Sequence, residues 1–442
     1  MKKVIAYVHT HWDREWYRPF QEYRLRLIEV VDKAIDDLES GNIEQFYFDG
    51  QTIALDDYLE IFPEKEEKIK SLIKDKKIMV GPWYILPDEF LVSGESLIRN
   101  LLIGINDSKK YGSNEFVGYL PDAFGHIANM PRILKSFNID NAIVWRGPGE
   151  QKTEFIWKSP DSSSILTTYL IEGYFQDILQ QEWDIAKKAE CLKLILDKIS
   201  EYSTSDTILL PVGADHYAPP VNLKQQIAEL NELLEDYDIQ SATIFDYINE
   251  INSKNLELSE IKDELRDNTR NFILPGTLSS RLYIKRENAI SNWKFIKLAE
   301  PFQALLESTG LAKSRKNQLE YGWKLLLKNH PHDSICGCSI DEVHDEMMPR
   351  YAQLNQISDG IIARCFRDIG NMYKKGGVIL YNASDYSYTG VIKIKSKEEL
   401  PENIFSQKVG TVREFPQEIL YNILKVPVQE DMTEFNEYLV WV

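Results

Sequence analysis

Apolar and polar positions alternate through roughly the first 250 residues in a way that predicts an α/β fold. Apolar residues recur at helical spacing in segments such as 26–40 and 223–237. We expect β-strands at residues 4–11, 44–50, 77–85, 116–122, 142–148, 167–174, 207–215 and 241–247. Strands that alternate with helices predict βαβ units and a mostly parallel sheet. Seven or eight strands make an irregular (β/α) barrel over residues 1–265 the expected architecture.

The pattern changes in the second half of the chain. Residues 287–308 and 314–330 show helical periodicity, and a third long helix is expected after the break at 331–338. Three antiparallel helices predict a three-helix bundle over residues 266–375. The apolar runs after it alternate as strands do. We therefore expect residues 376–442 to be the beginning of a truncated β-sandwich domain.

Composition and charge narrow the class of protein. Hydrophobic residues make up 43% and charged residues 27% of the 442 residues, a balance typical of soluble globular proteins. The formal net charge of -18 disfavours binding to nucleic acid or to an anionic membrane. The N-terminal apolar run turns polar too early for a signal peptide, and no run approaches about 18 apolar residues. Four cysteines without a framework of spacings favour a reduced, cytoplasmic setting.

Polar side chains gather where the expected strands end. The residues at or just past carboxyl ends of strands are His11, Asp13, Asp49, Trp83, Asp122, Arg146 and Asp215. In α/β barrels and open α/β sheets the active site lies at that edge. The sequence therefore predicts a site built from the ends of several strands.

The pair His11-x-Asp13 could form half of a metal site. Residues i and i+2 of a strand point to the same side, and imidazole nitrogen with carboxylate oxygen suits zinc. The alternative is a structural histidine that bonds to the backbone. His9 shares the same side and could be the ligand instead, but it sits deeper in the strand, where we expect a core or supporting histidine.

Two further stretches could complete the site. Asp122 ends an apolar strand before a glycine-containing turn, so it could equally be an N-cap or an Asx-turn. His330, His332 and Asp333 lie in a break between helices, where packing or capping is the alternative. Taken together, His11, Asp13, Asp122 and His332 would give four zinc ligands, provided that the helical segment reaches over the mouth of the barrel.

Several stretches resemble the glycoside hydrolase family 38 α-mannosidases. They are "HTHWDREW" (9–16), "PDAFGH" (121–126), "PVGADH" (211–216) and "NHPHDS" (329–334), with "GPWYILPDEFLVSGESLIRNL" (81–101) and "WRGP" (145–148) in the variant typical of bacterial members. The resemblance extends to about residue 375 in the family's order of barrel, three-helix bundle and β domains. Members are usually much longer, so the resemblance implies a truncated piece that holds nearly all catalytic motifs.

The resemblance implies a role for each matching residue. His11, Asp13, Asp122 and His332 match the zinc ligands, and Asp122 also matches the nucleophile. Trp16 matches an aromatic residue beneath the sugar, Arg146 an arginine near the nucleophile, and Asp333 a carboxylate that borders metal and sugar. Asp215 is the candidate acid/base, although His216 beside it departs from many members.

The activity implied is retaining hydrolysis of terminal α-linked mannose. Such hydrolysis needs two carboxylates about 5–5.5 Å apart, one a nucleophile and the other an acid/base. The zinc ion is expected to chelate two sugar hydroxyls rather than to generate hydroxide. Trp83 could offer an additional platform for the sugar, with core packing as its alternative.

Two other function classes stay open. A metal-dependent deacetylase or amidohydrolase on a similar barrel would use the same histidines and aspartates to activate water, and a catalytically silent relative would bind carbohydrate without turnover. Cys336 and Cys338 lack further cysteine or histidine at ligand spacing, which disfavours a cysteine-rich zinc site. The expected partner is an α-mannoside, not nucleic acid or membrane. A homodimer is left open, as is the linkage, including a mannosyl-glycerate type.

Overall fold

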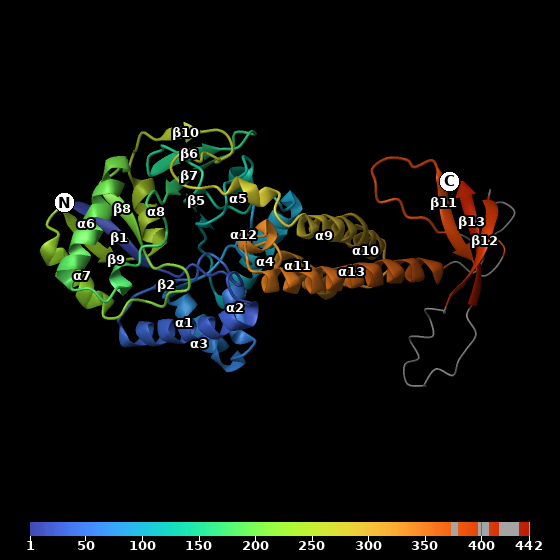
Figure 1. The fold of residues 1–442 in the computed structure, drawn as a ribbon, viewed down its shortest axis with the longest axis horizontal. Helices are drawn as coiled ribbons and strands as arrows, with labels where there is room; N and C mark the ends of the chain where they lie inside the picture. The colour runs from blue at the N-terminus through green and yellow to red at the C-terminus, as the bar shows by residue number, and fades with distance from the viewer. Residues whose placement is uncertain (373–378, 397–398, 400–405, 415–432, 442) are drawn as a thin grey trace. The chain divides into compact units, whose positions relative to one another are not determined.

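The computed structural model describes residues 1–372, 379–396, 399, 406–414 and 433–441. Within them the chain divides into two compact units, residues 1–291 with 320–354 and residues 292–319 with 355–442. The first unit contains the expected α/β arrangement, and the alternation of strands and helices in the sequence is confirmed (Figure 1). Part of the region expected to begin a β-sandwich, residues 376–442, lies outside the described residues.

The strands and helices of the first unit follow one another along the chain. The first half comprises β1 (Lys2–Val8), α1 (Phe20–Ser40), β2 (Phe46–Tyr47), α2 (Ile53–Leu59), η1 (Pro63–Lys65), α3 (Glu66–Lys74), β3 (Ile78–Met79), α4 (Gly94–Tyr111), β4 (Gly118–Leu120) and α5 (Met130–Ser136). The second comprises β5 (Asn141–Val144), β6 (Glu154–Lys158), β7 (Ser164–Tyr169), η2 (Ile178–Gln180), α6 (Ile185–Tyr202), β8 (Thr207–Val212), α7 (Leu223–Leu233), β9 (Tyr237–Ser241), α8 (Ile244–Ser253), β10 (Ser259–Ile261) and η3 (Pro275–Leu278).

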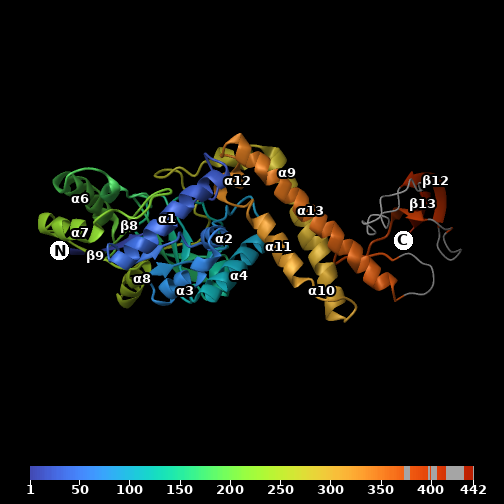
Figure 2. The ribbon, with the colours of Figure 1, turned by 90° about the horizontal axis from the view of Figure 1, so that it is seen from below.

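Helices dominate the next part of the chain. These are α9 (Leu282–Trp293), the π-helical η4 (Lys294–Ala299), α10 (Glu300–Ser308), α11 (Lys316–Leu327), α12 (His332–Cys336) and α13 (Asp341–Gly370). Figure 2 shows α13 as one continuous helix. In the second unit β11 (Val391–Ser396), β13 (Thr433–Trp441) and β12 (Ser406–Glu414) pair antiparallel in that order. Across the described residues, no helix is both long and apolar enough to cross a membrane.

The strands of the first unit form separate sheets. Their orders are β8-β1-β9, β10-β6-β7-β5-β4 and β2-β3. Isolated bridges such as His9 to Tyr47 connect neighbouring sheets, but no closed barrel forms among the described residues. The β2 and β3 strands are two residues long because Asp49, Gly50 and Gly81, which follow them closely, have positive φ angles that leave the extended conformation.

Two features of the sheets differ from the pattern expected. Strand β6 was not expected, and it pairs antiparallel with β7 through a turn in which Ser159 N donates to Ser163 O, so this sheet is mixed. The strand predicted at 241–247 is wrong, because β9 ends at Ser241 and helix α8 begins at Ile244. A capping box between Thr243 and Asp246 starts this helix, whose apolar β-branched residues resemble those of a strand.

The core of the first unit lies between the sheets and their helices. Strand β1 is buried on both faces from Val4 to Val8, and helices α6, α7 and α8 pack on the sheet that it shares with β8 and β9 (Figure 1). Helix α4 approaches the segment after β3 closely: a Cβ added to Gly104 would lie 2.2 Å from Pro82 O. At this crossing only glycine leaves room for the backbone of residues 82–84.

We predict that Gly104→Ala destabilises the protein by about 1–3 kcal/mol, because the new methyl group collides with backbone that cannot rotate away. Gly94→Ala at the first residue of α4 is the matched control, since nothing lies within 4 Å of its Cβ position. Urea denaturation of both variants tests the prediction. Equal stability of the two variants would contradict it.

Candidate active site and metal centre

His11 and Asp13 lie just beyond the carboxyl end of β1. His11 N donates to Ala214 O and His11 O accepts from His216 N, so the segment just after β8 holds this segment in place. Both side chains are buried, and His11 Nε2 lies 3.3 Å from Asp13 Oδ1. His9, one step deeper, is a core histidine whose Nε2 pairs with Tyr174 O, as expected.

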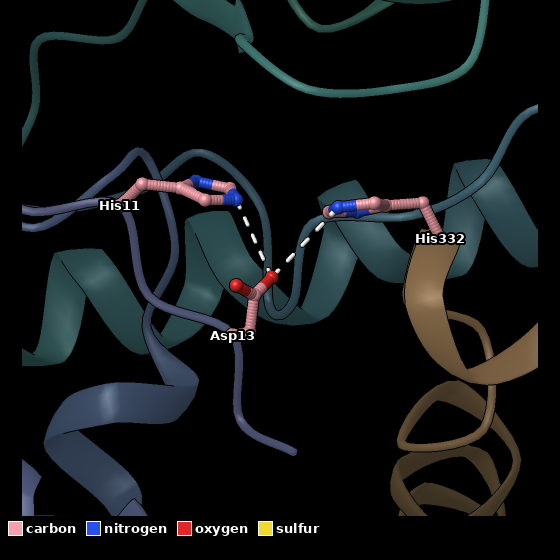
Figure 3. A group of neighbouring side chains, drawn as sticks. All are labelled: His11, Asp13 and His332. Carbon is pink, nitrogen blue, oxygen red and sulfur yellow. Dashed lines mark ion pairs between the residues drawn. The ribbon is translucent and has the colours of Figure 1, made fainter. Parts of the chain in front are cut away.

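The segment after α11 brings His332 to the same point. His332, the first residue of α12, is buried, and its Nε2 lies 3.8 Å from Asp13 Oδ1 (Figure 3). Asp122, which follows β4, places its Oδ2 3.1 Å from His332 Nε2 and 3.9 Å from His11 Nε2. The four side chains predicted as ligands therefore converge, although they come from three segments far apart in the sequence.

The spacing of these donor atoms fits a metal ion. Three donor atoms, one from each of His11, Asp13 and His332, lie within 4.8 Å of one another. Four donors bonded tetrahedrally to zinc at about 2.1 Å would be about 3.4 Å apart. The donor separations of 3.1 to 3.9 Å given above bracket that value. Two imidazoles and two carboxylates also form a donor set that zinc accepts.

The electrostatics of the site favour a cation. Burial alone would lower the pKa of His11, yet Asp49 and Asp13 raise that pKa well above its ordinary value. Burial likewise opposes the charge on His332, but Asp333 and Asp122 raise the pKa of His332 to about 9. This cluster of side chains thus attracts positive charge, which a divalent ion can supply in place of protons on the histidines.

Asp49 orients His11 and was not assigned a role from the sequence. Its Oδ2 lies 2.8 Å from His11 Nδ1 and also accepts hydrogen bonds from Trp12 N and Gln51 Nε2. The resulting carboxylate–histidine pair leaves Nε2 free to bind a metal ion. The position of Asp49 at the end of an expected strand was the only signal of this role in the sequence.

Arg146 holds Asp122 from the side away from His332. Its Nε and Nη2 donate to Asp122 Oδ1 at 2.9 and 2.7 Å, and its guanidinium stacks 3.9 Å from the centroid of the Trp145 ring. Burial would raise the pKa of Asp122, but the hydrogen bond from His332 and the charge of Arg146 hold it below its ordinary value. Asp122 is therefore ionised at neutral pH.

Asp215 follows β8 and has the opposite electrostatic environment. Burial raises its pKa to about 6, His11 opposes this rise, and the charges of Asp13 and Asp122 add to it. Tyr174 Oη donates to Asp215 Oδ1 at 2.8 Å, and the Tyr174 ring packs against His11. No pattern in the sequence indicates this contact of Tyr174 with Asp215.

The remaining predicted residues differ in their placement. Asp333 Oδ2 lies 3.7 Å from His332 Nε2, and burial raises the pKa of Asp333 to about 7. Trp16 is half-buried at the edge of the core. Trp83 is fully buried and donates its Nε1 to Tyr119 O, so it has no face for a sugar and the core-packing alternative is correct.

The two cysteines beside the site form hydrogen bonds with carboxylates. Cys338 Sγ donates to Asp333 Oδ1 at 3.1 Å, and Cys336 Sγ donates to Asp88 Oδ2 at 3.4 Å. None of the four cysteines is in a disulfide. These contacts agree with the view that the metal donors are histidines and aspartates.

Comparison with known protein families gives two matches, which together cover residues 1–369. Residues 1–272 match the "Glycosyl hydrolases family 38 N-terminal domain", and residues 273–369 match the "Alpha mannosidase middle domain". The chain belongs to glycosyl hydrolase family 38. The resemblance inferred from its motifs is thereby confirmed.

Individual relatives of this family 38 chain agree with that assignment. A putative mannosylglycerate hydrolase of Halalkalibacterium halodurans is 35% identical over 84% of this chain and 43% of its own length. The α-mannosidase G of Dictyostelium discoideum is 23% identical over 90% of this chain and 38% of its own length. The crystal structure of an α-mannosidase from Enterococcus faecalis superposes with a TM-score of 0.85 at 30% identity, covering 100% of this chain and 54% of that one. The family 38 chain thus spans about half the length of these proteins or less.

We predict that Asp49→Asn lowers the affinity of the family 38 chain for a divalent metal by about 10–100-fold, because His11 loses the carboxylate that orients it. Competition with a chromogenic chelator measures the affinity. Asp107→Asn serves as the control, because Asp107 is also a buried acid but pairs with Lys110 and Lys324. Unchanged affinity in Asp49→Asn would contradict the role assigned to this pair.

Proposed function

We propose that this chain carries the catalytic part of a zinc-dependent, retaining α-mannosidase. The observation that supports it is a pair of carboxylates with opposite pKa shifts beside a cluster of histidine and aspartate donors. The pKa of Asp122 lies below its ordinary value and that of Asp215 is raised to about 6. Retaining glycoside hydrolysis needs one carboxylate of each kind.

Asp122 is the proposed nucleophile. Arg146 donates two hydrogen bonds to its carboxylate, which keeps it charged and fixes its direction. His332 Nε2 also lies 3.1 Å from Asp122 Oδ2. In the first step a carboxylate oxygen of Asp122 forms a bond to the anomeric carbon as the bond from that carbon to the leaving oxygen breaks. The product is a mannosyl ester of Asp122, which water must later hydrolyse.

Asp215 is the proposed acid/base. It gives its proton to the leaving oxygen in the first step, and in the second step it takes a proton from the water that attacks the anomeric carbon. The hydrogen bond from Tyr174 fixes one oxygen of Asp215 and leaves the other for this transfer. The negative charge of Asp122 raises the pKa of Asp215, so the two carboxylates are close enough to interact.

Zinc, when bound by His11, Asp13, Asp122 and His332, would chelate two adjacent sugar hydroxyls and so favour a distorted ring. Trp16 is the proposed platform beneath the sugar, and Asp333 the proposed acceptor for its hydroxyls. Arg146 is proposed to keep the nucleophile in place as its charge is transferred to the sugar. Trp83 supports this site only as part of the core.

The domain organisation is part of the same proposal. We divide the chain into a catalytic α/β domain (1–265), a helical bundle that completes the site (266–375) and the beginning of a β-sandwich domain (376–442). The two family matches meet at residues 272 and 273, close to the first boundary.

The substrate class to test follows from one relative. Because that relative is named a mannosylglycerate hydrolase, α-mannosyl glycerate should be tested beside α-mannosyl glycans.

We predict that a 2-deoxy-2-fluoro or 5-fluoro mannosyl donor forms a covalent adduct on Asp122, because the fluorine slows hydrolysis of the ester more than its formation. Peptide mass mapping after incubation locates the adduct. Asp122→Asn should abolish it, whereas Asp107→Asn should not.

Two results would contradict the proposed function. An adduct on another residue would remove Asp122 as the nucleophile. Release of acetate from an N-acetylated sugar, without any adduct or turnover of an aryl α-mannoside, would favour the deacetylase class instead.

We predict that kcat/KM falls as the pH rises through about 6, because Asp215 must be protonated to act as the acid and its pKa lies there. Asp215→Asn should remove this limb and lower kcat/KM by about 10²–10⁴-fold for substrates with poor leaving groups. Aryl mannosides, whose leaving oxygen needs little protonation, should lose less. An unchanged pH profile in the variant would exclude Asp215 as the acid.

A further inference from the structure

Three of the candidate metal ligands lie on two segments from opposite ends of the first unit's sequence, and direct contacts join these two segments. His11 and Asp13 lie in the segment after β1, whereas His332 begins α12. Glu15, two residues after Asp13, accepts a hydrogen bond from Ser334 Oγ at 3.2 Å. These contacts do not involve the donor atoms themselves.

Arg350 of α13 forms the strongest of these links. Its Nη1 donates to Glu15 Oε1 at 2.8 Å, and its Nη2 donates to Glu15 Oε2. The same Nη1 also donates to Lys328 O and Asn329 Oδ1 at 2.8 and 2.9 Å. One guanidinium therefore binds the segment that carries Asp13 and the segment that leads into His332.

The pair is deeply buried. The Glu15 side chain is 0% exposed and that of Arg350 is 11% exposed. Removing two charges from water costs free energy that their attraction offsets only in part, so a buried ion pair adds little net stability. What such a pair contributes is geometry: a bidentate fork allows few relative positions of its two partners.

We propose that Glu15 and Arg350 are positioning residues that hold His332 at ligand distance from Asp13 before the metal binds. The proposal rests on the metal centre of the proposed function. Its physical basis is preorganisation: without the link, binding of the ion would have to order the two segments, and that cost would appear as weaker affinity.

The matched control is a second buried ion pair on the same segment. Arg14 Nε donates to Asp57 Oδ2 at 2.8 Å and Arg14 Nη2 donates to Asp57 Oδ1 at 3.2 Å, with both side chains buried. This pair ties the segment to α2 rather than to α12. It separates a requirement for any buried ion pair from a requirement for one that joins the two ligand-bearing segments.

The test compares Glu15→Gln, Arg350→Gln, the double variant and Asp57→Asn. Two quantities are measured for each: the zinc dissociation constant, by chelator competition, and the urea midpoint of the metal-free protein. We expect each single variant at Glu15 or Arg350 to bind zinc about 10–100-fold more weakly. The double variant should regain stability, because no unpaired charge stays buried, yet bind zinc as weakly as the single variants.

Asp57→Asn should lose stability and keep the wild-type zinc affinity. Arg350→Lys, a milder change, retains the charge but not the fork and should bind zinc with intermediate affinity. This variant keeps the test decisive if a glutamine variant does not fold.

Four outcomes would overturn the proposal. Zinc affinity that recovers together with stability in the double variant would show that the pair is only structural. An equal loss of affinity in Asp57→Asn would show that joining the two segments is not what matters. If the wild-type protein binds no zinc, the proposed metal centre itself is wrong. If the wild-type protein binds zinc and the variants bind it equally well, only the positioning role of Glu15 and Arg350 is wrong.

Discussion

Buried negative charge is the constraint on which this site depends. Asp13, Asp49 and Asp333 surround His11 and His332 in a region that excludes water almost completely. Carboxylates so placed need compensating positive charge, since the desolvation of each would otherwise favour its neutral form. The raised pKa values of both histidines express this demand. A divalent cation meets it with the same side chains, and that is why the cluster is consistent with a metal centre.

The same principle separates the two carboxylates proposed for catalysis. Asp122 receives hydrogen bonds from Arg146 and His332, so its charge is compensated within a few ångströms. Asp215 receives one hydrogen bond, from the neutral Tyr174, and lies near other negative charges. Two chemically identical side chains, one just after β4 and the other just after β8, thus acquire different protonation states. The fold produces this difference by where it places cations, not by which acids it uses.

The candidate metal donors could be found from the sequence, but the residues that orient and support them could not. His11, Asp13, Asp122 and His332 stood out because they are polar residues at strand ends or in helix breaks. Asp49, Tyr174 and Arg350 act through contacts with residues 38 to 335 positions away, which no local pattern records. Trp83 shows the reverse error: it follows a strand as a site residue would, yet it is fully buried. The apolar residues of α8 were likewise mistaken for a strand, since a capping box outweighed their β propensity.

The sequence by itself determined the α/β class, the family and the candidate donor side chains, because periodicity and motif chemistry are local properties. Only the tertiary structure decided that His332 reaches Asp13, that Asp122 and Asp215 differ in pKa, and that the sheets stay separate instead of closing. Each of these depends on distances between segments that the chain separates by many residues. Coulomb interactions and desolvation act through those distances, so they are fixed only when the fold is complete.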